Sequence, residues 1–266
     1  MFIHNIDPVL LHLGPFSIRY YGLVYALGFL FVTHSLIKSL DKKPIIHLTK
    51  EKATDMMMWG IIWLVLGARM FHVITDLPFY LNNPLLIPAV WRGGMAFFGG
   101  FIGVSTYIYF FSKKNKISLF EIGDRLITPI PLILGLGRIA NFINAEHVGY
   151  VTTLPWAVKF PGIEGFRHPV QIYEAITMFL LFFILMYLSK KKLKKGSLFL
   201  FFMLFYGIFR VSTEFFRIDM VKLSVFTDAQ WLSIIFFIIG LSGLIRLYKI
   251  NYLFWWVHNE KHNNRK

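Results

Sequence analysis

The sequence predicts an all-α membrane protein, folded as a polytopic helical bundle with seven transmembrane helices. Hydrophobic residues make up 56% of its 266 residues, charged residues only 16%, and the mean hydropathy is +0.58. This composition lies outside the usual balance of soluble globular domains. Long apolar stretches alternate with short polar ones, and lysines gather in every second polar stretch. Apolar stretches of this length are typical of membrane-spanning helices.

A short segment precedes the first span. Residues 1–19 are interrupted by prolines and a glycine and are too short to cross a bilayer, so we expect them to lie along the membrane interface. Pro129 and Pro131 break the fourth span, and Pro169 suits the first turn of the fifth. The seven spans cover about residues 20–37, 54–74, 93–112, 119–143, 169–189, 197–216 and 228–247.

The basic residues predict the orientation of these spans. Clusters of lysine follow spans one, three, five and seven, whereas the other connections hold few basic residues. Because cytoplasmic loops carry the excess of lysine and arginine, the N-terminus is expected outside and the C-terminus in the cytoplasm. The chain has no internal repeat, so we expect one domain over residues 1–266, with a basic cytoplasmic tail over about 248–266. Six glycines are expected to allow close helix packing: Gly22, Gly60, Gly67, Gly99, Gly100 and Gly103.

Several classes of function are disfavoured. The formal net charge of +14 lies in loops between apolar spans, which is not the pattern of a nucleic-acid-binding protein. Cysteine is absent, so a thiolate metal site or a cysteine nucleophile on this chain is excluded, and we expect no metal and no cofactor. The inner halves of the spans hold few ionisable groups, which disfavours transport across the bilayer. The N-terminus lacks the pattern of a signal peptide, so we expect it to be mature sequence.

The end of the fourth span, residues 135–149, holds the most unusual stretch. Arg138 lies at membrane depth, where a cation costs about 2.5–3.5 kcal/mol on insertion scales, so a functional role is the default hypothesis. On a helix, Arg138 and Asn141 share a face at i, i+3, and Asn144 falls near them. The alternative is an arginine that extends to the lipid headgroups, with amides that cap a helix end.

The predicted topology places the polar groups of the spans on the outer side. An excess of arginine over glutamate there indicates an anionic ligand, and the planar guanidinium suits a phosphate, most simply that of a phospholipid headgroup. Arg210, Glu214 and Arg217 are spaced i, i+4, i+7, so they also fit a structural ion-pair stripe. The outer-side residues are Tyr21, Arg69, His72, Arg138, Asn141, Asn144, Arg210, Glu214 and Arg217.

Six stretches in this order resemble the prolipoprotein diacylglyceryl transferase family, over nearly the full chain. They are residues 19–25, 66–69, 93–100, 135–149, 167–174 and 206–217. The resemblance implies a multi-pass enzyme of the bacterial plasma membrane, the inner one if the cell has two, with its active site toward the outer leaflet. It implies transfer of the diacylglyceryl group from phosphatidylglycerol to the lipobox cysteine thiol of a preprolipoprotein. Glycerol 1-phosphate is then released.

The resemblance also implies site residues. Arg138 and Arg210 match the arginines at the phosphatidylglycerol headgroup, and Tyr21 matches an essential tyrosine. The expected catalytic residues are Arg138, Arg210, Tyr21, Asn141 and Glu146. The expected substrate-binding residues are Arg138, Arg210, Arg69, Asn144, Gly149, His168, Glu214 and Arg217. Arginines held in a water-poor site would stabilise charge on the departing phosphate.

One departure from the family concerns the activation of the thiol. The family usually carries a histidine where this sequence has Phe98, and that histidine is its favoured candidate for the task. Because a free thiol has a pKa of about 8.5, a base or a cationic field is needed near neutral pH. We expect the arginines to lower the thiol pKa and His168, Glu146 or Tyr21 to accept the proton, although His168 also suits a helix start. The alternative is a divergent paralogue that binds anionic phospholipid with weak or no transferase activity.

Overall fold

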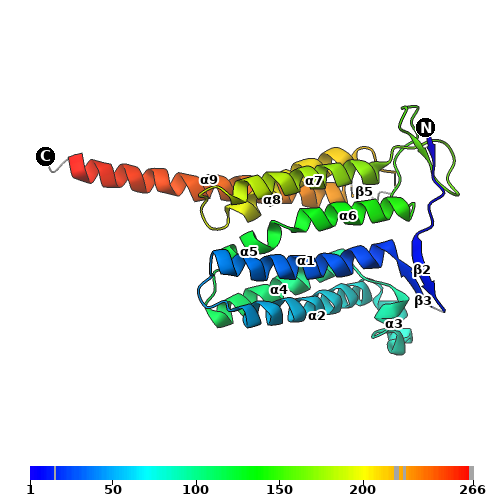
Figure 1. Cartoon of the computed structure of the whole chain (residues 1–266), viewed down its shortest axis with the longest axis horizontal. Coiled ribbons are helices and arrows are strands. Elements are labelled where there is room, and N and C mark those ends of the chain that lie inside the picture. The colour runs from blue at the N-terminus through cyan, green and yellow to red at the C-terminus, as the bar shows by residue number, and fades with distance from the viewer. Residues whose placement is uncertain (15, 219–221, 224–225, 264–266) are drawn as a thin grey trace. The chain divides into compact units, whose positions relative to one another are not determined.

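The computed structural model describes residues 1–14, 16–218, 222–223 and 226–263, and it is mostly helical (Figure 1). Residues 264–266 of the predicted basic tail lie outside the described residues. The helices are α1 Tyr20–Lys42, α2 Lys50–Thr75, α3 Leu77–Asn82, α4 Phe97–Asn115, α5 Leu119–Ile127, α6 Ile130–Ile143, α7 Val170–Ser189, α8 Ser197–Glu214 and α9 Asp228–Asn263, with short 3-10 turns at Pro84–Leu86 and Val90–Arg92.

The mostly helical structure agrees with the predicted helical fold, and short strands accompany the helices. The N-terminal segment predicted at the interface forms strands, because the left-handed backbone of Gly14, with φ of +58°, reverses the chain between two runs of apolar residues. The strands are β1 Phe2–Ile3, parallel to β4 Val158–Lys159; β2 Val9–Leu13, antiparallel to β3 Phe16–Arg19; and β5 Lys222–Leu223, antiparallel to β6 Phe226–Thr227.

Among the described residues, five helices are long and apolar enough to cross a membrane. They are α1, α2, α7, α8 and the part of α9 over Ala229–Lys249. The helices α5 and α6 are bent by 42° at the prolines, and if this pair counts as one span the number of candidate spans rises to six. The bend confirms that the predicted fourth span is broken. The third predicted span corresponds to α4, which is not among the five. It begins four residues later than expected because Gly93 and Gly94, with φ of 86° and 74°, do not have the backbone conformation of a right-handed helix.

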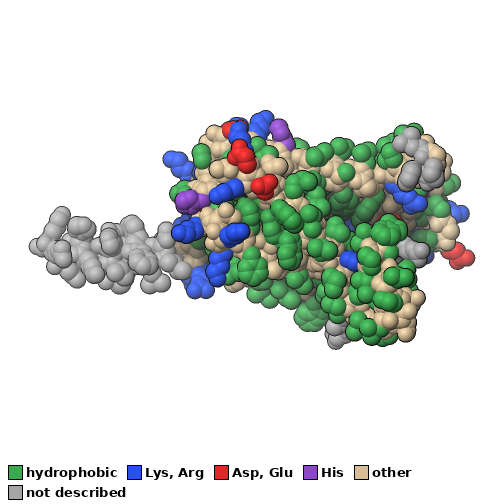
Figure 2. Space-filling view, turned by 90° about the horizontal axis from the view of Figure 1, so that it is seen from below, with side chains coloured by type: hydrophobic (Ala, Val, Ile, Leu, Met, Phe, Trp, Pro, Cys, Tyr) green, Lys and Arg blue, Asp and Glu red, His purple; other side chains and the backbone are tan. Residues whose placement is uncertain are grey.

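The exposed side chains agree with a protein that is surrounded by lipid. Large hydrophobic residues cover much of the face in Figure 2. Leu30, Phe110 and Phe183 are each at least 60% exposed, although they lie in the middle of helices. Exposure of this extent would be unusual in a soluble monomer.

The contacts divide the chain into two compact units, Met1–Val32 with Gly123–Lys266, and Thr33–Ile122. The single domain over 1–266 stays a prediction. In the first unit, α7 lies beside α6 and α8, and α8 packs along α9 (Figure 1). Its core includes Met178, Leu181 and Leu185 of α7 with Phe202 and Met203 of α8. This packing brings the end of α6, the start of α7 and the end of α8 together.

In the second unit, α2 and α4 touch backbone to backbone. A β-carbon on Gly67 would lie 2.3 Å from the Gly99 carbonyl oxygen, and one on Gly103 would lie 2.3 Å from the Trp63 oxygen. These glycines and Gly100, which lies against Leu64, confirm the predicted close packing. The prediction is wrong for Gly22, which has nothing within 4 Å, and at Gly60 the nearest atom is at an ordinary 3.8 Å.

We therefore expect Gly67→Ala to destabilise the protein by about 1–3 kcal/mol, because the added methyl group overlaps a main-chain oxygen that cannot move alone. Thermal unfolding in detergent measures the effect as a lower Tm. Gly22→Ala is the matched control, since it adds the same methyl group to a helix at an open position. A Tm that falls equally in both variants would contradict the packing role of Gly67.

Candidate active site

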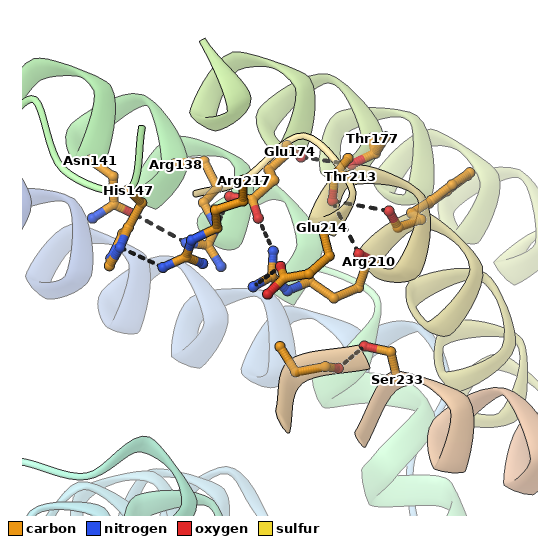
Figure 3. A network of polar contacts seen from close by, with 12 residues as sticks. Arg138, Asn141, His147, Glu174, Thr177, Arg210, Thr213, Glu214, Arg217 and Ser233 are labelled. Carbon is orange, nitrogen blue, oxygen red and sulfur yellow. Dashed lines mark hydrogen bonds and ion pairs between the residues drawn. The ribbon is translucent and has the colours of Figure 1, made fainter. Parts of the chain in front are cut away.

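One buried carboxylate joins three helices at the centre of the first unit (Figure 3). Glu174, in the second turn of α7, forms an ion pair with Arg138 Nε of α6 at 3.1 Å through Oε2 and accepts a hydrogen bond from Arg210 Nη1 of α8 through Oε1. Arg210 Nη2 lies 2.6 Å from an oxygen of Glu214, one turn further along α8. Buried charges are tolerated when they are paired in this way.

The two arginines differ in how much of each guanidinium remains available. Arg210 lies between Glu174 and Glu214, and its side chain is only 10% exposed. The side chain of Arg138 is 26% exposed, and besides the contact with Glu174 it donates to Asn141 Oδ1 at 3.4 Å. Arg138 Nη2 donates no hydrogen bond to any other described residue. Arg138 can therefore offer one edge of its guanidinium to an anion, whereas Arg210 holds the helices and their charges in place.

The turn after α6 is fixed by two amides and by its backbone. Asn141 Nδ2 and Asn144 Nδ2 donate to the two oxygens of Glu146 at 3.0 and 3.1 Å. Ala145 and His147 adopt φ values of 56° and 59°, a left-handed conformation that is uncommon for residues other than glycine. Such strain persists where the surroundings hold it, and it is frequent at functional sites. The structure thus brings together Asn141, Asn144 and Glu146, as the sequence predicts.

Arg217 does not continue the predicted stripe of α8. The spacing is correct for Arg210 and Glu214, but the helix ends at Glu214, and Arg217 lies beyond it. Its Nη2 contacts His147 Nδ1 at 2.6 Å, and Figure 3 shows this pair beside Arg138. Burial and the neighbouring Arg217 lower the pKa of His147 below the ordinary value of histidine.

Gly149 and His168 lie on two short antiparallel segments of the connection between α6 and α7. Gly149 N donates to the His168 carbonyl at 3.1 Å, and a β-carbon on Gly149 would lie 2.6 Å from His168 Cβ. The His168 ring lies 3.1 Å from the Tyr173 hydroxyl through Nδ1, and Trp156 donates to the same hydroxyl at 2.8 Å. The Tyr173 hydroxyl therefore links the Trp156 and His168 side chains. Burial lowers the pKa of His168, so its ring is neutral near pH 7.

Tyr21 lies one turn from a second tyrosine. The rings of Tyr21 and Tyr25 are 4.8 Å apart, and Tyr21 is 39% exposed. Gly137 leaves room for the Tyr25 hydroxyl, since a β-carbon there would lie 2.9 Å from it. Tyr25 therefore contacts α6 directly beside Arg138.

Arg69 and Phe98 belong to the second unit. Arg69 donates to four main-chain oxygens at 2.5 to 3.0 Å, and these contacts tie the end of α2 to the loop that leads into α4. The acceptors are Leu86, Ile87, Gly93 and Gly94. This geometry gives Arg69 a structural role, and its predicted role in substrate binding stays a prediction. Phe98 lies in the first turn of α4 and is 37% exposed.

Sequence reasoning did not assign three residues of the network to the site. They are Glu174, His147 and Gln171, whose Nε2 donates to the Glu146 carbonyl. Gln171 and Glu174 are spaced i, i+3 in an otherwise apolar helix and are both buried, which is a signal that could have found them. His147 has no such signal, because its partner is 70 residues away. Within the described residues, no group of three His, Cys, Asp or Glu side chains could hold a metal ion.

Replacing the shared carboxylate tests the network. We expect Glu174→Gln to lower the free energy of unfolding by about 3–5 kcal/mol, because breaking the buried ion pair leaves Arg138 without a carboxylate partner and Arg210 with Glu214 alone. Chemical or thermal unfolding in detergent measures this loss. Glu164→Gln, which removes an exposed carboxylate, should change stability by less than about 0.5 kcal/mol. A small effect at Glu174 would contradict the bridging role.

The lowered pKa of His147 predicts a dependence of stability on pH. Below the ordinary histidine pKa of about 6.5, the unfolded chain takes up a proton that folded His147 resists, so the free energy of unfolding falls as the pH falls. We expect the loss between about pH 7.5 and 5.5 to be smaller in His147→Gln, which keeps an acceptor for Arg217. Equal slopes in the two proteins would contradict a neutral, buried His147.

Comparisons with known proteins show the family to which the chain belongs. The family model described as prolipoprotein diacylglyceryl transferase matches residues 8–246. A phosphatidylglycerol--prolipoprotein diacylglyceryl transferase of Vibrio atlanticus is 39% identical over 252 residues, which cover 92% of each chain. Proteins of the same name from Photobacterium profundum and Pseudomonas fluorescens are 40% and 38% identical, and the matches cover 86% and 96% of this chain and 86% and 94% of theirs. The chain therefore belongs to the prolipoprotein diacylglyceryl transferase family.

Proposed function

We propose that this chain transfers the diacylglyceryl group of phosphatidylglycerol to the lipobox cysteine of preprolipoproteins, the first step of bacterial lipoprotein maturation. The relatives carry this activity in their names. The observation that carries the proposal is the arrangement of Arg138. Glu174 and Asn141 hold its guanidinium, and one edge stays available. A phosphate in contact with that edge receives charge-assisted hydrogen bonds from a donor that is already oriented.

The chemistry requires stabilisation of a leaving phosphate. The thiolate sulfur forms a bond to the carbon of the diacylglyceryl group that bears the phosphate ester. The bond between this carbon and the ester oxygen breaks, and its electron pair stays on the departing glycerol phosphate. Negative charge increases on the phosphate oxygens as this bond breaks. Arg138 stabilises that charge, and Glu174 prevents the guanidinium from turning away. A single preorganised donor of this kind contributes about 10²–10³-fold to kcat.

The thiol proton needs an acceptor, and we assign this role to Glu146. Its carboxylate is connected to Arg138 through Asn141, and the residue is exposed. His168 Nδ1 is already hydrogen-bonded to the Tyr173 hydroxyl, and Tyr21 packs on Tyr25. Tyr21 is then a residue that shapes the site, as are Gly149, Glu214 and Arg217.

We further propose seven spans, with α4 as the third and the site toward the outer leaflet of the bacterial plasma membrane. In the first unit, Glu174 and Arg210 lie near one end of α7 and α8, and the lysine cluster over 190–195 lies at the other end of this pair. Lysine clusters mark the cytoplasmic side, which supports an outer position for the site. The N-terminus is then outside, and phosphatidylglycerol of the outer leaflet is the lipid substrate.

The test is release of glycerol phosphate from phosphatidylglycerol in the presence of a lipobox peptide. We expect peptide-dependent release by the wild type and a loss of about 10²–10³-fold in Arg138→Ala. Arg246→Ala, which removes an exposed arginine of α9, is the matched control and should keep full activity.

Phe98→His distinguishes the outcomes further. Release by the wild type shows that the thiol is activated without a histidine at position 98. Release by Phe98→His alone would mean that the chain has lost its base and only binds anionic phospholipid. Release by neither protein would contradict the proposed function.

A further inference from the structure

A cavity of about 520 Å³ lies beside the turn that follows α6. Glu146, His147 and Arg167 supply its polar lining. The apolar part includes Val148 and Ile163. The volume falls in the range of small-ligand and peptide-side-chain sites. The cavity lies within the first unit, where the connection between α6 and α7 meets Ile218, which follows α8.

His147 has a defined protonation at this cavity. An arginine only donates hydrogen bonds, so the contact of Arg217 Nη2 with His147 Nδ1 at 2.6 Å requires a lone pair on Nδ1. The neutral ring therefore carries its proton on Nε2. The lowered pKa of His147 is consistent with a neutral ring. His147 thus brings a hydrogen-bond donor, and not a base, to the cavity wall.

The charges of the lining favour an uncharged ligand. Glu146 is negative, Arg167 is positive and His147 is neutral, so the wall has no net charge. Arg167 donates to the Glu164 carbonyl at 3.0 Å and to the Gly149 carbonyl at 3.3 Å, which holds its guanidinium in place. A peptide backbone has carbonyl groups for such donors and amide protons for the carboxylate. Small apolar side chains of such a peptide would contact the apolar part of the wall, which includes Val148 and Ile163.

We propose that this cavity receives the peptide segment at the acceptor cysteine, with His147 Nε2–H and Arg167 as donors to its carbonyl groups. The inference rests on the proposed transferase function. Glu146 supports it, because this residue lines the cavity and is also tied by Asn141 to Arg138. A cysteine bound here lies next to the group that takes its proton and near the arginine that holds the phosphate.

The absence of cysteine from the chain allows a direct test by disulfide trapping. Ile163→Cys places a single thiol in the cavity wall, and Val151→Cys places one on a side chain that is 62% exposed and does not line the cavity. The probe is a synthetic lipobox peptide whose cysteine is activated as a mixed disulfide with thionitrobenzoate. A bound thiol has an effective concentration in the millimolar range, so we expect trapping at Ile163→Cys to be at least about tenfold faster.

Competition separates binding from chance reaction. An excess of the same peptide with serine in place of cysteine should slow trapping at Ile163→Cys and leave Val151→Cys unchanged. A small maleimide first establishes that both thiols are accessible. Equal trapping rates, or trapping that the serine peptide does not slow, would overturn the proposal.

A second pair of variants gives a kinetic measurement. Ile163→Trp should fill the cavity and raise the KM for the lipobox peptide several-fold, with the KM for phosphatidylglycerol unchanged, and Val151→Trp should alter neither. An unchanged peptide KM in Ile163→Trp would contradict the proposal. If the wild type releases no glycerol phosphate, the transferase function fails. Turnover with unselective trapping overturns only the assignment of the cavity.

Discussion

The buried carboxylate of Glu174 is the interaction on which the site depends. It lies between two guanidiniums from different helices, so it compensates charge and holds α6, α7 and α8 together. Removing Glu174 would leave Arg138 without a carboxylate partner in a medium where solvation is poor. Because Arg210 is used by Glu174 and Glu214, the available edge belongs to Arg138. The same contacts therefore stabilise the fold and leave an open guanidinium edge on Arg138 and not on Arg210.

Hydrogen bonds connect this cluster to the turn after α6 and hold the turn in place. Two asparagine amides hold the two oxygens of Glu146, and the left-handed backbone at Ala145 and His147 gives the turn its shape. Groups that are fixed before substrate binds need no reorganisation during the reaction, which is the physical basis of electrostatic catalysis. Glu146 faces both the arginine network and the cavity, so one turn of chain connects the proposed lipid and peptide substrates.

The helices of the second unit are held together in a different way. Lipid tails are as apolar as leucine, so helices in a membrane associate through close packing and not through burial of apolar surface. Gly67, Gly99 and Gly103 allow α2 and α4 to meet at their backbones, while large hydrophobic side chains remain exposed to lipid. Arg69 then secures the loop before α4 through main-chain oxygens. Polar and small residues thus take the place that a hydrophobic core has in water.

The sequence by itself determined what depends on local order along the chain. Long apolar stretches predicted the helices, prolines predicted the broken fourth span, and i, i+3 spacing placed Asn141 beside Arg138, because helix geometry is set within a few residues. Tertiary structure decided the partners that lie far apart. Glu174 meets arginines of two other helices, Arg217 meets a histidine 70 residues away, and β1 pairs with β4. The periodic pattern of residues along a helix does not predict these contacts, because they depend on how the helices pack and on where α8 ends.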